Sequence, residues 1–89
     1  MAATIWKFPV QISDAAVVVE MPAGADVLCV HMQSGVATVW AVVDSAAKKE
    51  RRLFSWLPTG GDGPRDDEAY VGTVLVGPLV WHLFQVVAP

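Results

Sequence analysis

The sequence predicts a small all-β protein, either an antiparallel β-sandwich or a partly closed barrel of about six strands. Short runs of Val, Ile, Ala and aromatic residues alternate with polar residues along much of the chain. Turn signals containing Gly or Pro separate these runs, and only one short stretch resembles a helix. The 89 residues are the length of one domain, which we place at residues 1–89.

The best-defined element is a hairpin at residues 26–44, DVLCVHMQSGVATVWAVVD, because Ser34-Gly35 suits a two-residue turn. This turn sets four cross-strand pairs: Gln33 with Val36, His31 with Thr38, Cys29 with Trp40, and Val27 with Val42. The opposite face is wholly apolar and is the predicted core: Leu28, Val30, Met32, Ala37, Val39 and Ala41. The mixed face, which contains Trp40, is either solvated, covered by the chain or a second subunit, or used for binding.

The first strands follow from turn and breaker residues. Residues 4–10 are predicted to form an edge strand, because Pro9 cannot donate to a ladder. Residues 15–21 form the next strand, which Pro22 and Gly24 close in a turn. After the hairpin, residues 45–52 are either a short helix capped by Ser45 or a loop that opens a strand at 53–57.

Residues 58–68 form the longest loop, which we expect to be functional or mobile. Residues 70–76 and 79–87 are the last two strands, joined at Gly77-Pro78. No internal repeat is visible. The last 21 residues carry no formal charge, but their Gly, Pro and Val content favours two buried strands over a membrane helix.

Composition limits the classes of function. Apolar residues make up 54% of the chain and charged residues 17%, which is more apolar than a small monomer needs and predicts a homo-oligomer, most simply a dimer. The net charge of −3 argues against DNA binding. The single Cys29 fits a reducing compartment, and the N-terminus does not resemble a signal peptide, so we expect a cytoplasmic protein.

No catalytic residue can be named, and we expect a protein that is not an enzyme and needs no cofactor. The Gly-rich stretch at 59–63 lacks the Lys-Ser/Thr pair of a phosphate loop. The acidic residues at 62–68 do not match the spacing of an EF-hand. Cys29, His31 and His82 provide no fourth ligand, so no metal site is predicted.

The four Trp residues each lie on a different predicted strand, and a basic cluster precedes Trp56. They either fill the core beside a solvated basic face, or they stack on a flat anion whose oxygens bind Arg. The second alternative gives the candidate ligand-binding residues: Trp6, Trp40, Arg51, Arg52, Trp56 and His31.

The layout resembles a family of short uncharacterised proteins encoded by phages and prophages, over nearly the whole chain. The matching residues are Ile5 to Pro9, Glu20-Met21-Pro22 with Gly24-Ala25, Gln33-Ser34-Gly35, Trp40-Ala41, Val43-Asp44, Glu50-Arg51-Arg52 with Phe54, Thr59-Gly60, Tyr70 to Thr73, and Val80-Trp81-His82 with Phe84. The resemblance carries no known catalytic residues.

The resemblance implies a phage-associated role in the cytoplasm of the host cell. Two classes of function remain open. In one, a homo-oligomer sequesters a nucleotide-like host defence signal or inhibits a host protein. In the other, the chain is a structural or assembly accessory protein of a phage particle.

Overall fold

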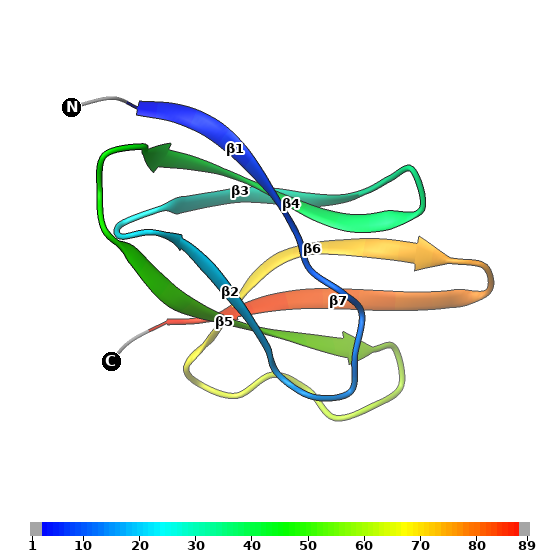
Figure 1. Cartoon of the computed structure of the whole chain (residues 1–89). Coiled ribbons are helices and arrows are strands. Elements are labelled where there is room, and N and C mark those ends of the chain that lie inside the picture. The colour runs from blue at the N-terminus through cyan, green and yellow to red at the C-terminus, as the bar shows by residue number, and fades with distance from the viewer. Residues whose placement is uncertain (1–2, 88–89) are drawn as a thin grey trace.

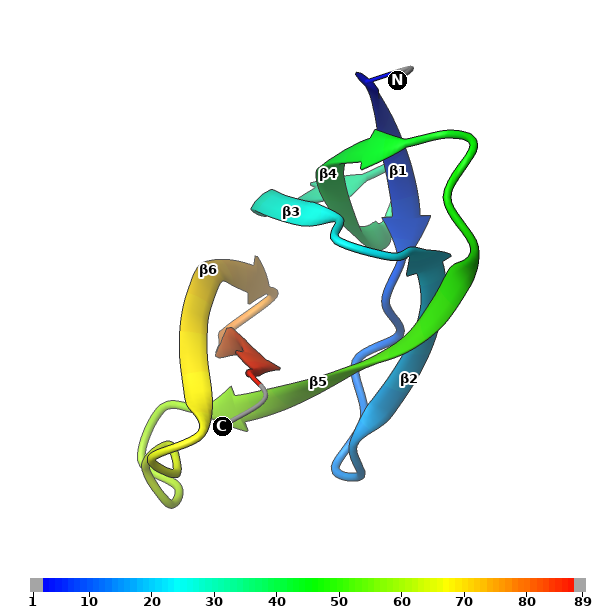
Figure 2. The ribbon, with the colours of Figure 1, turned by 90° about the vertical axis from the view of Figure 1, so that its left-hand side faces the viewer.

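The computed structural model describes residues 3–87 as seven antiparallel strands in two sheets, which form an open sandwich-like arrangement (Figures 1 and 2). The strands are β1 (Ala3–Pro9), β2 (Val17–Pro22), β3 (Asp26–Gln33), β4 (Val36–Asp44), β5 (Lys49–Pro58), β6 (Glu68–Val76) and β7 (Leu79–Val86). The three-stranded sheet has the order β1-β4-β3, and the four-stranded sheet has the order β2-β5-β7-β6. The all-β class is confirmed, and the seven strands are close to the predicted number of about six.

The short helix considered for residues 45–52 does not form. The chain turns after Asp44 instead. The Asp44 carboxylate accepts a hydrogen bond from the Ala46 N–H, and the Asp44 carbonyl accepts one from the Ala47 N–H. The basic stretch then joins the longest strand, β5, whose first half pairs with β2. Its polar residues therefore alternate between the two faces of a sheet, as strand geometry requires.

The β3–β4 hairpin has the predicted turn and most of the predicted register. Ser34 and Gly35 have φ angles of 50° and 79°, the positive values that a type I′ turn requires. Three predicted pairs are confirmed, but Val27 lies opposite Ala41 and not Val42, because the register shifts at Leu28. This β-bulge adds one residue to β3. As a result, the β3 residues before Leu28 lie on the opposite face of the sheet from the one predicted.

The bulge also explains one of two errors in the predicted core. Val30, Ala37, Val39 and Ala41 are buried, as predicted. Leu28, the bulged residue, is 48% exposed, and Met32, near the hairpin tip, is 37% exposed. The core cluster draws on both sheets: Val10, Met21, Ala25, Val30, Ala37, Val39, Ala41, Val43, Phe54, Trp56, Val74 and Leu83.

The two hairpins share one geometry although their sequences show no repeat. The β6–β7 hairpin also turns over two residues, Gly77 and Pro78, and its bulge, at Val71, has the same spacing from the turn as Leu28 in β3. Each hairpin also pairs with a strand that ends in proline, β1 at Pro9 and β5 at Pro58. The chain therefore contains two three-stranded units of equal register, β1-β4-β3 and β5-β7-β6.

The two sheets approach each other closely where Gly72 of β6 lies against Val30 of β3. A Cβ atom at position 72 would lie 2.8 Å from Val30 Cγ1, closer than such contacts occur. At the other margin, β1 pairs with β4 alone among the strands of residues 3–87, which confirms the predicted edge strand. No helix forms within residues 3–87, and none of that part of the chain could cross a membrane as a helix.

Candidate functional site

His31 and Trp40 are the two predicted site residues that the fold brings together. They project from neighbouring strands on the outer face of the three-stranded sheet, with ring centroids 6.3 Å apart and planes tilted by 55°. His31 is exposed and Trp40 is half-buried. Part of the indole face is therefore open to solvent beside an imidazole.

Lys7 completes this outer face, and sequence reasoning missed it. It lies directly opposite Trp40 in the β1–β4 register, and its Nζ donates a hydrogen bond of 2.8 Å to Gln33 Oε1 on β3. The alternation of β1 could have predicted this position, since Lys7 and Ile5 face away from the side of Phe8, which packs on the core. We call Lys7, His31, Gln33 and Trp40 the outer-face cluster.

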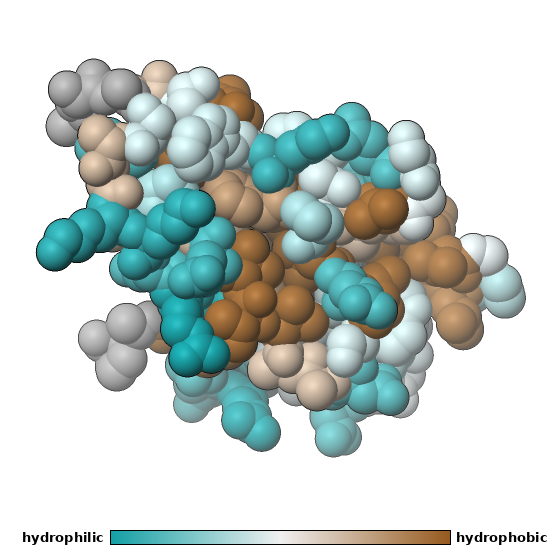
Figure 3. Space-filling model, viewed as in Figure 1, coloured by the Kyte–Doolittle hydropathy of each residue, from teal (hydrophilic) through white to brown (hydrophobic). Residues whose placement is uncertain are grey.

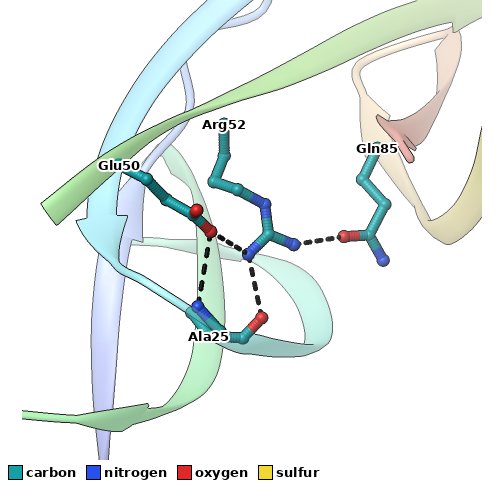
Figure 4. Close-up of polar contacts among 5 residues, drawn as sticks. Ala25, Glu50, Arg52 and Gln85 are labelled. Carbon is teal, nitrogen blue, oxygen red and sulfur yellow. Dashed lines mark hydrogen bonds and ion pairs between the residues drawn. The ribbon is translucent and has the colours of Figure 1, made fainter. Parts of the chain in front are cut away.

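Arg52 is held inside the protein by three other residues (Figure 4). Its Nη1 donates to the Ala25 carbonyl at 2.9 Å, and its Nη2 donates to Gln85 Oε1 at 3.0 Å. Glu50 Oε1 lies 3.6 Å from Nη1 and also accepts a bond from the Gly24 N–H. The guanidinium thus joins the β2–β3 turn to β7, and 19% of the side chain is exposed.

Arg51 projects from the other face of β5, opposite Glu20 in the β2–β5 register, and is exposed. A shallow hollow beside it is lined by Glu50, Arg52, Leu53, Val86 and Val87. No Trp from the described part of the chain contributes to this hollow, so the predicted pairing of Trp with Arg51 or Arg52 is not assembled there.

Trp56 and Trp6 occupy different environments. Trp56 is 3% exposed, and its Nε1 donates to the Gln11 carbonyl at 3.1 Å, so its indole is part of the core. Trp6 is 38% exposed on the edge strand β1. It lies on the side of β1 opposite to Lys7 and therefore outside the outer-face cluster.

An acidic hollow of about 510 Å³ lies where residues 59–67 fold back toward β5. Asp14, Asp62, Asp67 and Glu68 line it together with a single cation, Arg65. The Arg65 backbone N–H donates to Glu68 Oε1 at 2.8 Å, and this bond is the main reason that the pKa of Glu68 is lowered. Partial burial opposes the shift, while a Ser55 hydrogen bond and the Arg65 charge add to it. The excess of carboxylates makes this hollow unsuitable for an anion.

His82 lies in a chain of side-chain hydrogen bonds on the outer face of the four-stranded sheet. Its Nε2 is 2.8 Å from Thr59 Oγ1 and its Nδ1 is 2.8 Å from Thr73 Oγ1, which in turn lies 2.5 Å from the Tyr70 hydroxyl. These bonds fasten the start of the 59–67 loop to β7 and β6. His82 is therefore on a different sheet from Cys29 and His31, and residues 3–87 contain no group of three His, Cys, Asp or Glu side chains placed to hold a metal ion.

Apolar side chains gather at the ends of the two hairpins, and the surface of Figure 3 is apolar where the β6–β7 turn projects. Leu75 and Leu79 flank that turn and are 68% and 57% exposed. A groove of about 480 Å³ lies nearby, lined largely by the apolar residues Pro9, Ile12, Met32, Val36, Ala37 and Val76.

The comparisons with known proteins give one match. A family model described as Domain of unknown function (DUF7352) matches residues 1–89. No curated protein and no solved structure matches the chain.

Proposed function

The chain belongs to the DUF7352 family, and we propose that it is a non-enzymatic binding protein that works as a homo-oligomer. The resemblance to short phage proteins supports a phage-associated role in the host cytoplasm. The fold leaves many large apolar side chains in contact with solvent, and this observation is the main support for a homo-oligomer.

The total accessible area is larger than that of a typical compact monomer of this size. The accessible area is 5678 Å², compared with about 5,000 Å² for a compact monomer of the same mass. The molecule measures 42 × 33 × 17 Å and is therefore flat. Ile5, Leu75 and Leu79 are all more than half exposed. Association with a second copy would bury such surface and stabilise a small core.

Sedimentation velocity tests the oligomer. We expect a species of at least twice the 9.5 kDa chain mass between roughly 1 and 100 μM. A monomer across this whole range would sink the proposal.

The outer-face cluster favours a second, compatible function, the sequestration of a flat anion such as a nucleotide. Trp40 offers an aromatic face, and Lys7 lies opposite it in the register. His31 and Gln33 add polar groups beside the indole. Stacking of a base on an aromatic side chain contributes about 1–3 kcal/mol, and the ammonium group would balance phosphate charge.

Calorimetric titration of cyclic and linear nucleotides tests this second function. We expect the wild type to bind at least one of them, and Trp40→Ala and Lys7→Met to weaken binding by roughly tenfold or more. Arg51→Ala is the matched control, because Arg51 is an exposed cation on the other sheet.

The results separate three possibilities. Loss of binding in Arg51→Ala alone would move the site to β5. No binding by the wild type to any nucleotide would reject sequestration and leave assembly, as in a phage particle, as the role of the oligomer. Native mass spectrometry of the purified protein provides an independent test for a retained small molecule.

A further inference from the structure

β1 is an unpaired strand edge. It lies at the margin of the three-stranded sheet, and in the described part of the chain it pairs only with β4 (Figure 1). Six of its seven residues are exposed. The one charged side chain of β1 is Lys7. A charge on an edge strand disfavours pairing with another strand, but the Lys7 Nζ is hydrogen-bonded across the sheet face to Gln33. A free edge of this kind is a template for another strand.

The direction of the free backbone groups follows from one hydrogen bond. The Val10 N–H donates to the Ala37 carbonyl at 2.9 Å and so continues the β1–β4 ladder. Because antiparallel strands alternate, even-numbered residues of β1 bond to β4 and odd-numbered residues point their N–H and C=O groups outward. Ala3, Ile5 and Lys7 therefore present free donors at the edge. Pro9 is also an odd-numbered residue and points outward. Because the N–H that it lacks would not have bonded to β4, the β1–β4 ladder is unaffected.

We propose that two copies of the chain pair antiparallel through β1, which joins their three-stranded sheets into one six-stranded sheet. This inference rests on the proposed homo-oligomer and names the surface that forms it. A two-fold axis at β1 makes the contact self-complementary, as a closed dimer requires.

The register between the two β1 strands follows from the length of strand that they can pair and from the position of Lys7. Centring the axis on Trp6 matches all seven residues of β1 and places Trp6 against the partner's Trp6 and Ile5 against the partner's Lys7. Centring it on Lys7 would place two ammonium groups opposite each other, which is unfavourable. Centring it on Ile5 would match residues 3–7 of the described strand and so use less of β1.

The other edges are less suitable. The free edge of β3 faces β6, where Val30 contacts Gly72. β2 is largely covered, since two of its six residues are exposed, compared with six of seven in β1.

Proline substitution at the edge tests the contact. Ile5→Pro removes an outward N–H without removing a β1–β4 bond, so we expect a folded monomer by circular dichroism and sedimentation. Ile5→Ala is the matched control, because it shortens the same side chain and keeps the N–H, and it should remain a dimer. A dimeric Ile5→Pro protein would overturn the β1 interface but leave oligomerisation standing. A monomeric wild type would overturn both.

Cross-linking tests the register independently, in a Cys29→Ser background that removes the one native thiol. Trp6→Cys should form a disulfide-linked dimer on oxidation, because facing Cα atoms in a non-hydrogen-bonded pair lie about 4.5 Å apart. Thr4→Cys should not, because the two copies of position 4 would be about 13 Å apart along the strand. Cross-linking of both variants, or of neither, would overturn the proposed register.

Discussion

At the scale of single residues, Arg51 and Arg52 show how neighbours in a strand acquire different roles. They have the same side chain and adjacent positions, but one faces solvent and the other joins the β2–β3 turn to β7. The roles of the two arginines could not be distinguished from the sequence, because Ala25 and Gln85, the partners of Arg52, lie 27 and 33 positions away along the chain. The ligand-binding role predicted for both arginines stays a prediction.

This difference predicts unequal effects on stability. Arg52→Ala leaves the Ala25 carbonyl and the Gln85 amide without their donor and should cost about 1–3 kcal/mol in the free energy of unfolding. Arg51→Ala should change it by no more than about 0.5 kcal/mol. Urea denaturation followed by Trp fluorescence measures both values. Equal losses in the two variants would contradict the internal role of Arg52.

Glu68 predicts a dependence of stability on pH. The Arg65 N–H holds its pKa in the folded state below the value near 4.5 of an unperturbed carboxyl. Its contribution to the free energy of unfolding is therefore complete above pH 4.5 and is lost as the pH falls through the lower folded pKa. Denaturation of wild type and Glu68→Gln at several pH values should show a difference that disappears in acid. Asp66→Asn, which removes one charge from an exposed side chain of the same loop, is the control.

At the scale of elements, turn chemistry predicted more than composition did. Ser34-Gly35 predicted the turn of the hairpin and three of its four named pairs correctly. The bulge at Leu28 was not foreseen, since neither Leu28 nor its neighbours are residues that mark a bulge in a sequence. The basic stretch before Leu53 was open to interpretation as a helix because its residues favour helices, whereas pairing with β2 makes it a strand.

The contact between β3 and β6 predicts that Gly72 cannot be enlarged. In Gly72→Ala the added methyl would overlap Val30 Cγ1 and force β6 away from β3, which should cost about 1–3 kcal/mol. Gly63→Ala is the matched control, because nothing lies within 4 Å of the added atom. Thermal unfolding of the two variants measures the difference. An equal melting temperature in both would mean that the two sheets can separate there without cost.

At the scale of the whole molecule, the two three-stranded units share one core, which alternating patterns could not predict. Ala41 and Val39 of the first unit are buried, whereas Trp40 between them lies on the outer face. The second unit buries Leu83, which has the position of Trp40 in the shared register. The units therefore turn opposite faces inward, and corresponding residues have different environments. This explains why a common geometry leaves no visible repeat in the sequence.

Division of the chain in the turn between β4 and β5 tests whether the two units depend on each other. A fragment of residues 1–46 contains β1 to β4, but its β2 has lost β5, the strand with which it pairs. A fragment of residues 47–89 contains Phe54, Trp56 and Leu83 without the residues that cover them. Each fragment alone should therefore be unfolded, because neither can bury a core of its own. Mixing them at equal concentration should restore β structure by circular dichroism and bury Trp56, which would shift its fluorescence to shorter wavelength. Cooperative unfolding of either fragment alone would show that one unit is a domain in its own right, and the shared core would then be an interface between two domains.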